Sequence, residues 1–290
     1  MSRTHHIRSR VEVNEATLHA LGHDLEGLGE SPTTDAAPVA LISEADPTDV
    51  TAFDDASTAP TDVLACCRET IWTPDAESVL FWEGKDRARG TEEFRALRSH
   101  LYRLRKEQSF KSLLITSALP KEGRSFVAVN LAQVLALQPQ CRVLLIDADL
   151  RSRRLHHFFG TYAIPGLSEY LLQETDELAI MQRGCEEGLL FIPSGRSVPQ
   201  PTELISNGRL KSLMARVEPL FDWIIVDAPP AIQVSDACML ANSCDGVLLV
   251  VRSSSTPFDV VRKARARFRE ESLVGVVLNE IKADSSSKLG

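Results

Sequence analysis

Three aspartates and one serine in this sequence have the types and spacing of a magnesium and phosphate site. Asp147 and Asp149 end the apolar run VLLI, Asp227 ends the run WIIV, and Ser125 precedes the apolar stretch FVAV. Carboxylate and hydroxyl oxygens are the ligands that Mg²⁺ prefers when it is held against phosphates. A single aspartate at such a position more often caps the following turn, but three of them together predict a shared metal site at Ser125, Asp147, Asp149 and Asp227.

The segment from Ala118 to Ser125, ALPKEGRS, has the length of the phosphate-binding loop G-x-x-x-x-G-K-[ST]. Gly123 and Ser125 match it, whereas Ala118 replaces the first glycine and Arg124 replaces the lysine. An apolar run precedes the loop and a helix-like stretch follows it, so backbone N–H groups would face a phosphate. The residues predicted to bind the phosphates are Pro120, Lys121, Glu122, Gly123, Arg124, Ser125 and Phe126.

Apolar runs alternate with amphipathic stretches from about residue 72 onward, as in a parallel sheet wrapped by helices. The runs are almost entirely apolar, which predicts strands that are buried on both faces. We therefore expect an α/β, P-loop NTPase-like, mostly parallel sheet with helices on both faces. The expected strands are 112–118, 142–149, 189–195, 222–230, 245–254 and 274–281, and the expected helices are 124–138, 166–173, 208–220, 235–244 and 256–271.

Ligands of such sheets bind at the carboxyl ends of the strands, where all the acids named above are expected. Arg252 and Asn279 lie at the ends of the last two expected strands. Their position predicts contacts with the base of a nucleotide.

The part of the chain before the sheet is acidic. Residues 11–67 contain twelve acids and neither lysine nor arginine, and because the whole chain has a net charge of -8, the rest is net positive. The stretch is poor in large apolar residues and should not bury enough surface to fold. We predict a largely disordered arm over 1–71, a helical segment over 72–108, a P-loop ATPase-like domain over 109–283 and a short tail over 284–290.

The sequence has no apolar run long enough to span a bilayer, and its first ten residues do not have the apolar core of a signal peptide. These features predict a cytoplasmic protein. The basic run RKARARFR could contact nucleic acid, but a solvated helix face paired with Glu270 and Glu271 is favoured, so no nucleic-acid partner is expected.

Several segments occur in the order and spacing of one known family. They are EEFRALR, TSALPKEGRSFVAVNLA, VLLIDADLR, GLSEYL, PTELI, IIVDAPP followed by VSDA, and GVVLN. From about residue 74 to residue 282, the chain therefore resembles the bacterial tyrosine kinases, in the form that is separate from its membrane partner.

The resemblance implies ATP and Mg²⁺ as cofactors and transfer of the γ-phosphoryl group to tyrosine. It implies catalytic roles for Arg124, Asp147, Asp149 and Asp227, with one of the first two aspartates taking the hydroxyl proton. The expected partner is a membrane chain-length regulator of exopolysaccharide or capsule synthesis, which would recruit the chain to the inner face of the cell membrane. Packing of copies into a ring would use Glu92, Arg95 and Arg98.

Three departures from the family pattern bear on activity. Lys121 stands where the family has glycine, so it either strains the loop and crowds the phosphates or supplies the missing ammonium. Arg124 keeps the charge of the family's lysine but not its compact shape, which should harm phosphoryl transfer more than binding. The tyrosine-rich tail is replaced by IKADSSSKLG, so a substrate tyrosine has to come from elsewhere.

Two alternatives to an active kinase follow from these departures. The altered loop favours a pseudokinase-like module, in which bound nucleotide only sets the docking state. The fold and the strand-end acids are also shared with the partition and septum-positioning ATPases, but those have a lysine at the position of Leu119.

Overall fold

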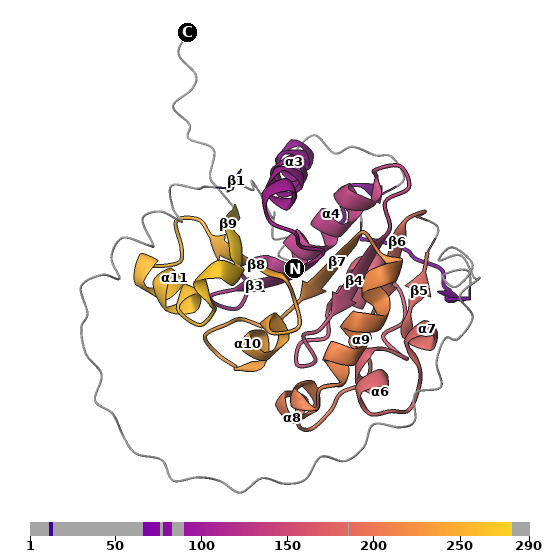
Figure 1. The fold of residues 1–290 in the computed structure, drawn as a ribbon. Helices are drawn as coiled ribbons and strands as arrows, with labels where there is room; N and C mark the ends of the chain where they lie inside the picture. Colours follow the sequence, from indigo (N-terminus) through magenta and orange to yellow (C-terminus); the bar gives the residue numbers. More distant parts are fainter. Residues whose placement is uncertain (1–11, 14–65, 76–77, 83–89, 185, 280–290) are drawn as a thin grey trace, which may run out of the picture.

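The computed structural model describes residues 12–13, 66–75, 78–82, 90–184 and 186–279. One sheet runs through this part of the chain, with strand order β1-β9-β8-β3-β7-β4-β6-β5-β2. Helices cover both of its faces (Figure 1). The predicted α/β fold with a mostly parallel sheet is confirmed.

The strands are β1 (Glu12–Val13), β2 (Arg68–Glu69), β3 (Ser112–Ser117), β4 (Val143–Asp147), β5 (Gln182–Arg183), β6 (Leu189–Ile192), β7 (Trp223–Asp227), β8 (Gly246–Arg252) and β9 (Leu273–Asn279). The α-helices are α3 (Thr91–Glu107), α4 (Arg124–Ala136), α5 (Leu155–Phe159), α6 (Leu167–Leu171), α7 (Glu177–Ile180), α8 (Pro201–Ser206), α9 (Arg209–Val217), α10 (Asp236–Ala241) and α11 (Phe258–Arg265). Two 3₁₀ turns are η2 (Glu218–Leu220) and η3 (Glu270–Ser272).

The central strands β9, β8, β3, β7, β4 and β6 are parallel to one another. Their side chains alternate between two cores: Leu113 and Ile115 of β3 face one, and Leu114 faces the other. Helices α3 and α4 cover the first core, and α6, α9, α10 and α11 cover the second. Burial on both faces explains why these strands are apolar at almost every position.

All six predicted strands are present as β3, β4, β6, β7, β8 and β9. The predicted boundary of the arm at residue 71 is wrong, because Cys67 is buried in the core and Arg68–Glu69 pair with β5. Glu12–Val13 also pair with β9. The rest of the predicted arm and the predicted tail lie outside the described residues.

Helix α3 carries the three residues predicted to join copies of the chain. Its apolar side packs on α4 through residues such as Phe94. Glu92 and Arg95 form an ion pair with each other, and Glu92 is exposed. Arg98 donates a hydrogen bond of 2.8 Å to the carbonyl oxygen of Val134 on α4.

Among the described helices, none has the length and apolar character needed to cross a lipid bilayer.

Candidate functional site

The loop from Ala118 to Gly123 joins the end of β3 to the start of α4. Gly123 has a φ of 89°, a left-handed conformation that glycine adopts without strain, whereas Lys121 adopts a φ of 66° with a full side chain. The first N–H groups of a helix have no partner within it, and those of α4 open onto this loop. The loop therefore has the backbone arrangement that receives phosphates.

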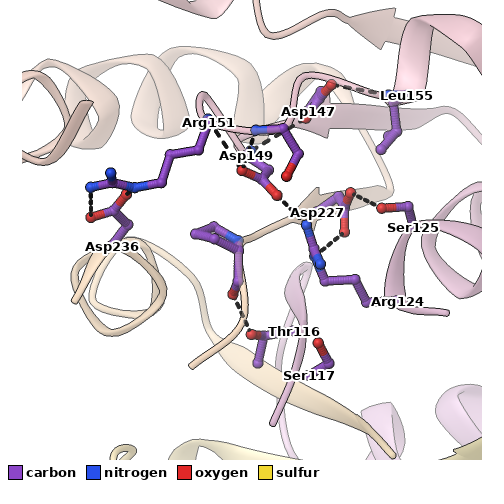
Figure 2. Close-up of polar contacts among 12 residues, drawn as sticks. Thr116, Ser117, Arg124, Ser125, Asp147, Asp149, Arg151, Leu155, Asp227 and Asp236 are labelled. Atoms are coloured by element: carbon purple, nitrogen blue, oxygen red, sulfur yellow. Dashed lines mark hydrogen bonds and ion pairs between the residues drawn. The ribbon is translucent and has the colours of Figure 1, made fainter. Parts of the chain in front are cut away.

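The predicted metal ligands are close to one another in the structure. Asp147 and Asp227 are register partners at the ends of the neighbouring strands β4 and β7. Ser125 donates a hydrogen bond of 2.6 Å to the Oδ2 of Asp227. Figure 2 shows these side chains and Asp149 gathered at the start of α4. The sheet thus assembles all four predicted ligands at its carboxyl edge, as expected from the strand ends.

Two of these aspartates also cap the chain that follows them. Asp147 accepts a hydrogen bond of 3.1 Å from the backbone N–H of Leu155, at the start of α5. The Oδ1 of Asp149 accepts hydrogen bonds from the backbone N–H groups of Arg151 and Ser152. The capping interpretation and the shared-site interpretation therefore both apply to them.

Arg124 points into the acidic cluster. Its Nη2 contacts the Oδ2 of Asp149, and its Nε lies 3.5 Å from the Oδ1 of Asp227. The guanidinium is nearly buried, and both aspartates are fully buried. The charge that was predicted to bind phosphates is therefore paired with two of the predicted metal ligands.

Burial changes the acidity of the cluster. Burial and the charge of Asp227 raise the pKa of Asp147 to about 8. Burial also raises the pKa of Asp227 to about 6, although Arg124 and the hydroxyl of Ser125 act in the opposite direction. Buried carboxylates without enough positive charge tend to retain protons, so the raised pKa of Asp147 favours its protonated form.

The ligand types at the site fit a magnesium ion that arrives with a nucleotide. The buried Oδ1 of Asp227 accepts no hydrogen bond from the described residues, and Asp147 lacks a compensating charge. No three Asp, Glu, His or Cys side chains in the described ranges form a ready metal centre. Mg²⁺ is usually held by one or two carboxylates together with substrate phosphates, and the residue types present here fit such an ion.

Glu122 braces the loop instead of facing a phosphate. Its buried carboxylate accepts hydrogen bonds from the backbone N–H groups of Leu119 (2.6 Å) and Arg252 (3.3 Å), and from the hydroxyl of Thr256. The side chain of Glu122 is therefore occupied within the loop, and the predicted contact of this loop residue with a phosphate stays a prediction. The negative charge of the Glu122 carboxylate would also be repelled by a phosphate.

Asn279 holds the same loop from strand β9. Its Nδ2 donates a hydrogen bond of 2.9 Å to the carbonyl oxygen of Glu122. A Cβ on Gly123 would come within 1.9 Å of that Nδ2, so this position has room only for glycine. The amide is fully buried against the loop, and the predicted contact of Asn279 with a nucleotide base stays a prediction.

The remaining predicted contacts differ in placement. The ring of Phe126 lies in the core with its centroid 5.8 Å from that of Phe94, so the side chain does not face the loop. Pro120 and Lys121 are exposed at the tip of the loop. The side chain of Arg252 is half-buried, and its contact with a base stays a prediction.

A polar network that could not be foreseen from the sequence joins the segments VLLIDADLR, PTELI and VSDA. Arg151 donates hydrogen bonds to the carboxylate of Asp236 on α10 and to the hydroxyl of Thr202 on α8, and Thr202 donates one to Asp236. Figure 2 shows the side chain of Arg151 pointing away from Asp227 and toward Asp236. Each of these residues lies in one of the three segments, but nothing in the sequence indicates that the segments are adjacent in the fold.

Comparison with known proteins gives consistent matches. The chain is 35% identical to the tyrosine-protein kinase YwqD of Bacillus subtilis over 202 residues, which are 69% of this chain and 85% of that protein. It is 35% identical to the tyrosine-protein kinase CpsD of Streptococcus agalactiae, with coverage of 67% and 84%. The kinase domain of the Escherichia coli tyrosine kinase ETK superposes with a TM-score of 0.64 at 33% identity, with coverage of 70% and 80%. No family profile matches.

Proposed function

Because this chain belongs to the family of bacterial tyrosine-protein kinases, we propose that it binds Mg-ATP and transfers the γ-phosphoryl group to a tyrosine of another polypeptide. One observation supports this site above all. The oxygens of Ser125, Asp147, Asp149 and Asp227 converge where the loop after β3 meets the start of α4. Converging acids beside unpartnered backbone N–H groups suit a magnesium-bound polyphosphate.

Each residue of the site has a proposed role. Ser125, Asp147 and Asp149 hold the metal, and Asp227 orients Ser125 through their 2.6 Å hydrogen bond. The loop amides hold the phosphates. Bound Mg²⁺ would neutralise charge that develops on the transferring phosphoryl group. The carboxylate of Asp147 or Asp149 accepts the proton of the tyrosine hydroxyl.

Arg124 exchanges partners when nucleotide binds. In the structure it forms an ion pair with Asp149 and lies near Asp227. Guanidinium groups bind phosphate oxygens with two parallel hydrogen bonds. A rotation of this side chain toward the loop would transfer its charge to the phosphates and expose both carboxylates to the incoming metal.

The biological setting is proposed from the family. Matched residues cover 85% of YwqD and 26% of the E. coli kinase etk. We place it at the inner face of the cell membrane, beside a chain-length regulator of exopolysaccharide or capsule synthesis. Contact between copies would use the exposed pair of Glu92 and Arg95 on α3, with Arg98 fixing that helix to α4.

The test is ATP-dependent phosphorylation of a random Glu–Tyr copolymer, detected as radiolabelled phosphotyrosine. We expect labelling by the wild-type chain and none by the Asp147→Asn variant. The double variant Lys121→Gly with Arg124→Lys should label faster, because it restores the loop residues of the family. Absence of labelling by both the wild type and the double variant would reject kinase activity.

One observation favours a second candidate, a nucleotide-binding module without turnover. The ion pair of Arg124 with Asp149 occupies the carboxylate that catalysis would need. In this case Mg-ADP binds tightly in calorimetric titration, Asp147→Ala weakens that binding, and neither the wild type nor the double variant labels the copolymer. Labelling by the wild type would exclude this candidate.

A further inference from the structure

The three tyrosines of the chain are in very different environments. Tyr170 is buried in the core, with 4% of its surface exposed. Tyr102 is half-buried, with its ring packed on Trp223 and its hydroxyl 3.8 Å from the sulfur of Cys141. Tyr162 is 64% exposed. All three belong to the described part of the chain, so one tyrosine presents most of its surface to an enzyme.

Tyr162 lies on the connection between α5 and α6, where its backbone is fixed to strand β5. Its carbonyl oxygen accepts a hydrogen bond of 2.8 Å from the side-chain amide of Gln182. Thr161 donates a second bond of 2.8 Å to the same side chain. The hydroxyl of Tyr162 forms no hydrogen bond with another described residue. The backbone is thus anchored while the ring is accessible.

A guanidinium lies beside this ring. Arg68 of strand β2 is placed over it, with 5.6 Å from its Cζ to the ring centroid. Its Nη1 donates a hydrogen bond of 3.3 Å to the carbonyl oxygen of Ile164. Arginine forms strong, charge-assisted hydrogen bonds with phosphate. A phosphate on the hydroxyl of Tyr162 would therefore have a cation already held beside it.

We propose that Tyr162 is the phosphorylation site of this chain and that a second copy of the chain modifies it, an inference that rests on the proposed function. The bond between the γ-phosphorus of ATP and the oxygen bridging to the β-phosphate breaks, and a bond from that phosphorus to the Oη of Tyr162 forms. ADP leaves, and the phenolic proton passes to a carboxylate of the second copy's site. Gln182 holds Tyr162 beside β5, whereas the acidic cluster lies at the ends of β4 and β7. This position favours transfer from the site of a second copy.

The modification would also change the contact with Arg68. The added phosphate carries about -1.5 to -2 charges at neutral pH and replaces a weak ring contact by an ion pair. Phosphorylated protein should therefore melt at a higher temperature than unmodified protein at low salt. Arg68→Gln should remove that increase without preventing the transfer.

The experiment incubates the full chain with Mg-ATP, alone and with the Glu–Tyr copolymer, and locates phosphate by peptide mass spectrometry. We expect phosphate on Tyr162. The Tyr162→Phe variant should lose labelling of the chain and keep wild-type labelling of the copolymer. Tyr102→Phe and Tyr170→Phe are the matched controls and should both retain labelling on Tyr162.

A mixing experiment tests transfer between copies. Asp147→Asn provides an inactive chain with Tyr162, and Tyr162→Phe provides an active chain without it. Label on the Asp147→Asn chain in the mixture supports the proposal. Label on Tyr162 only when it shares a chain with an intact Asp147 would overturn transfer between copies. Copolymer labelling with Tyr162 unmodified would overturn the site but not the proposed function, whereas no labelling of either would overturn both.

Discussion

Arg124 contacts Asp149 through its Nη2, so the first residue of α4 is ion-paired with the residue two positions beyond β4. The contact is buried, and Asp227 lies 3.5 Å from the Nε of the same guanidinium. Removing one partner of a buried ion pair leaves a charge without compensation, which typically costs about 3–5 kcal/mol. Arg124 therefore stabilises the cluster of aspartates at the place proposed for the metal.

Replacing Arg124 by alanine should make the fold depend on a divalent cation. We expect Arg124→Ala to lower the free energy of unfolding by about 3 kcal/mol in the presence of a chelator, because two aspartates lose their counter-charge. Added Mg²⁺ should raise the melting temperature of this variant more than that of the wild type. The measurement is thermal unfolding with and without Mg²⁺.

A matched control for this variant is Arg196→Ala. Arg196 forms an exposed ion pair with Glu174, which is not one of the acids of the cluster. Exposed pairs contribute little to stability, and this one should not respond to Mg²⁺. Equal Mg²⁺ responses of Arg124→Ala and the wild type would show that Arg124 does not occupy the position of a metal.

The raised pKa of Asp147 predicts how stability changes with pH. The ordinary value is 3.8 and the folded value is about 8, so between these pH values the folded chain holds a proton that the unfolded chain releases. Stability contributed by this group is complete below the lower value and is lost as the pH rises toward the higher one. Asp147→Asn should therefore gain stability relative to the wild type as pH increases.

Denaturant unfolding of both proteins from about pH 5 to about pH 8 measures this difference. Asp227, with a folded pKa of about 6, adds a smaller fall over the lower part of the range in both proteins. A difference between the variant and the wild type that stays constant with pH would contradict the assignment.

The left-handed backbone of Lys121 predicts opposite results for two small replacements. Lys121→Ala keeps a Cβ at a φ of 66°, whereas Lys121→Gly removes it. A non-glycine residue in this conformation costs about 1–2 kcal/mol, part of which glycine loses again as chain entropy. We expect the glycine variant to be about 1 kcal/mol more stable than the alanine variant.

Calorimetric titration of the same pair with Mg-ADP separates the two roles left open for Lys121. If its ammonium binds phosphate, both variants bind more weakly than the wild type. If its side chain crowds the phosphates, both bind at least as tightly. Equal free energies of unfolding for Lys121→Ala and Lys121→Gly would contradict backbone strain at this position.

The hydrogen bond from Asn279 to the loop predicts an effect on nucleotide affinity. Asn279→Ala removes a buried donor from the carbonyl of Glu122, and a lost hydrogen bond of this kind costs about 1 kcal/mol. Because the loop would lose its fixed shape, we expect weaker binding of Mg-ADP by calorimetry. Asn279→Asp, which has the same size but no amide donor, should weaken binding at least as much, and unchanged affinity in both variants would contradict the brace.

The sequence contains enough information to place the site on the sheet. Strands such as β4 and β7 are apolar at every position before their final aspartate, which identifies both the strand and the edge where it ends. The direction of a side chain within the crevice has no such signal. Whether Arg124 faces a phosphate or Asp149 depends on the charges nearby, and those come from strands distant in sequence.

Short elements could not be predicted from periodicity. Strands β2 and β5 have two residues each, too few to show an alternating pattern. This is why the boundary of the arm was placed after the residues that pair with β5. The role of Glu122 could not be predicted either, because its partners Arg252, Thr256 and Asn279 come from the other end of the domain.

Asn279 is the last residue of β9, and it meets the loop across a separation of 157 residues. During translation, the ribosome therefore delivers the loop long before the residue that holds it. Until strand β9 has been added to the sheet, a nascent chain has the complete loop sequence without its brace. Tight binding of nucleotide would then require the complete domain, and a prematurely terminated chain would not bind ATP tightly.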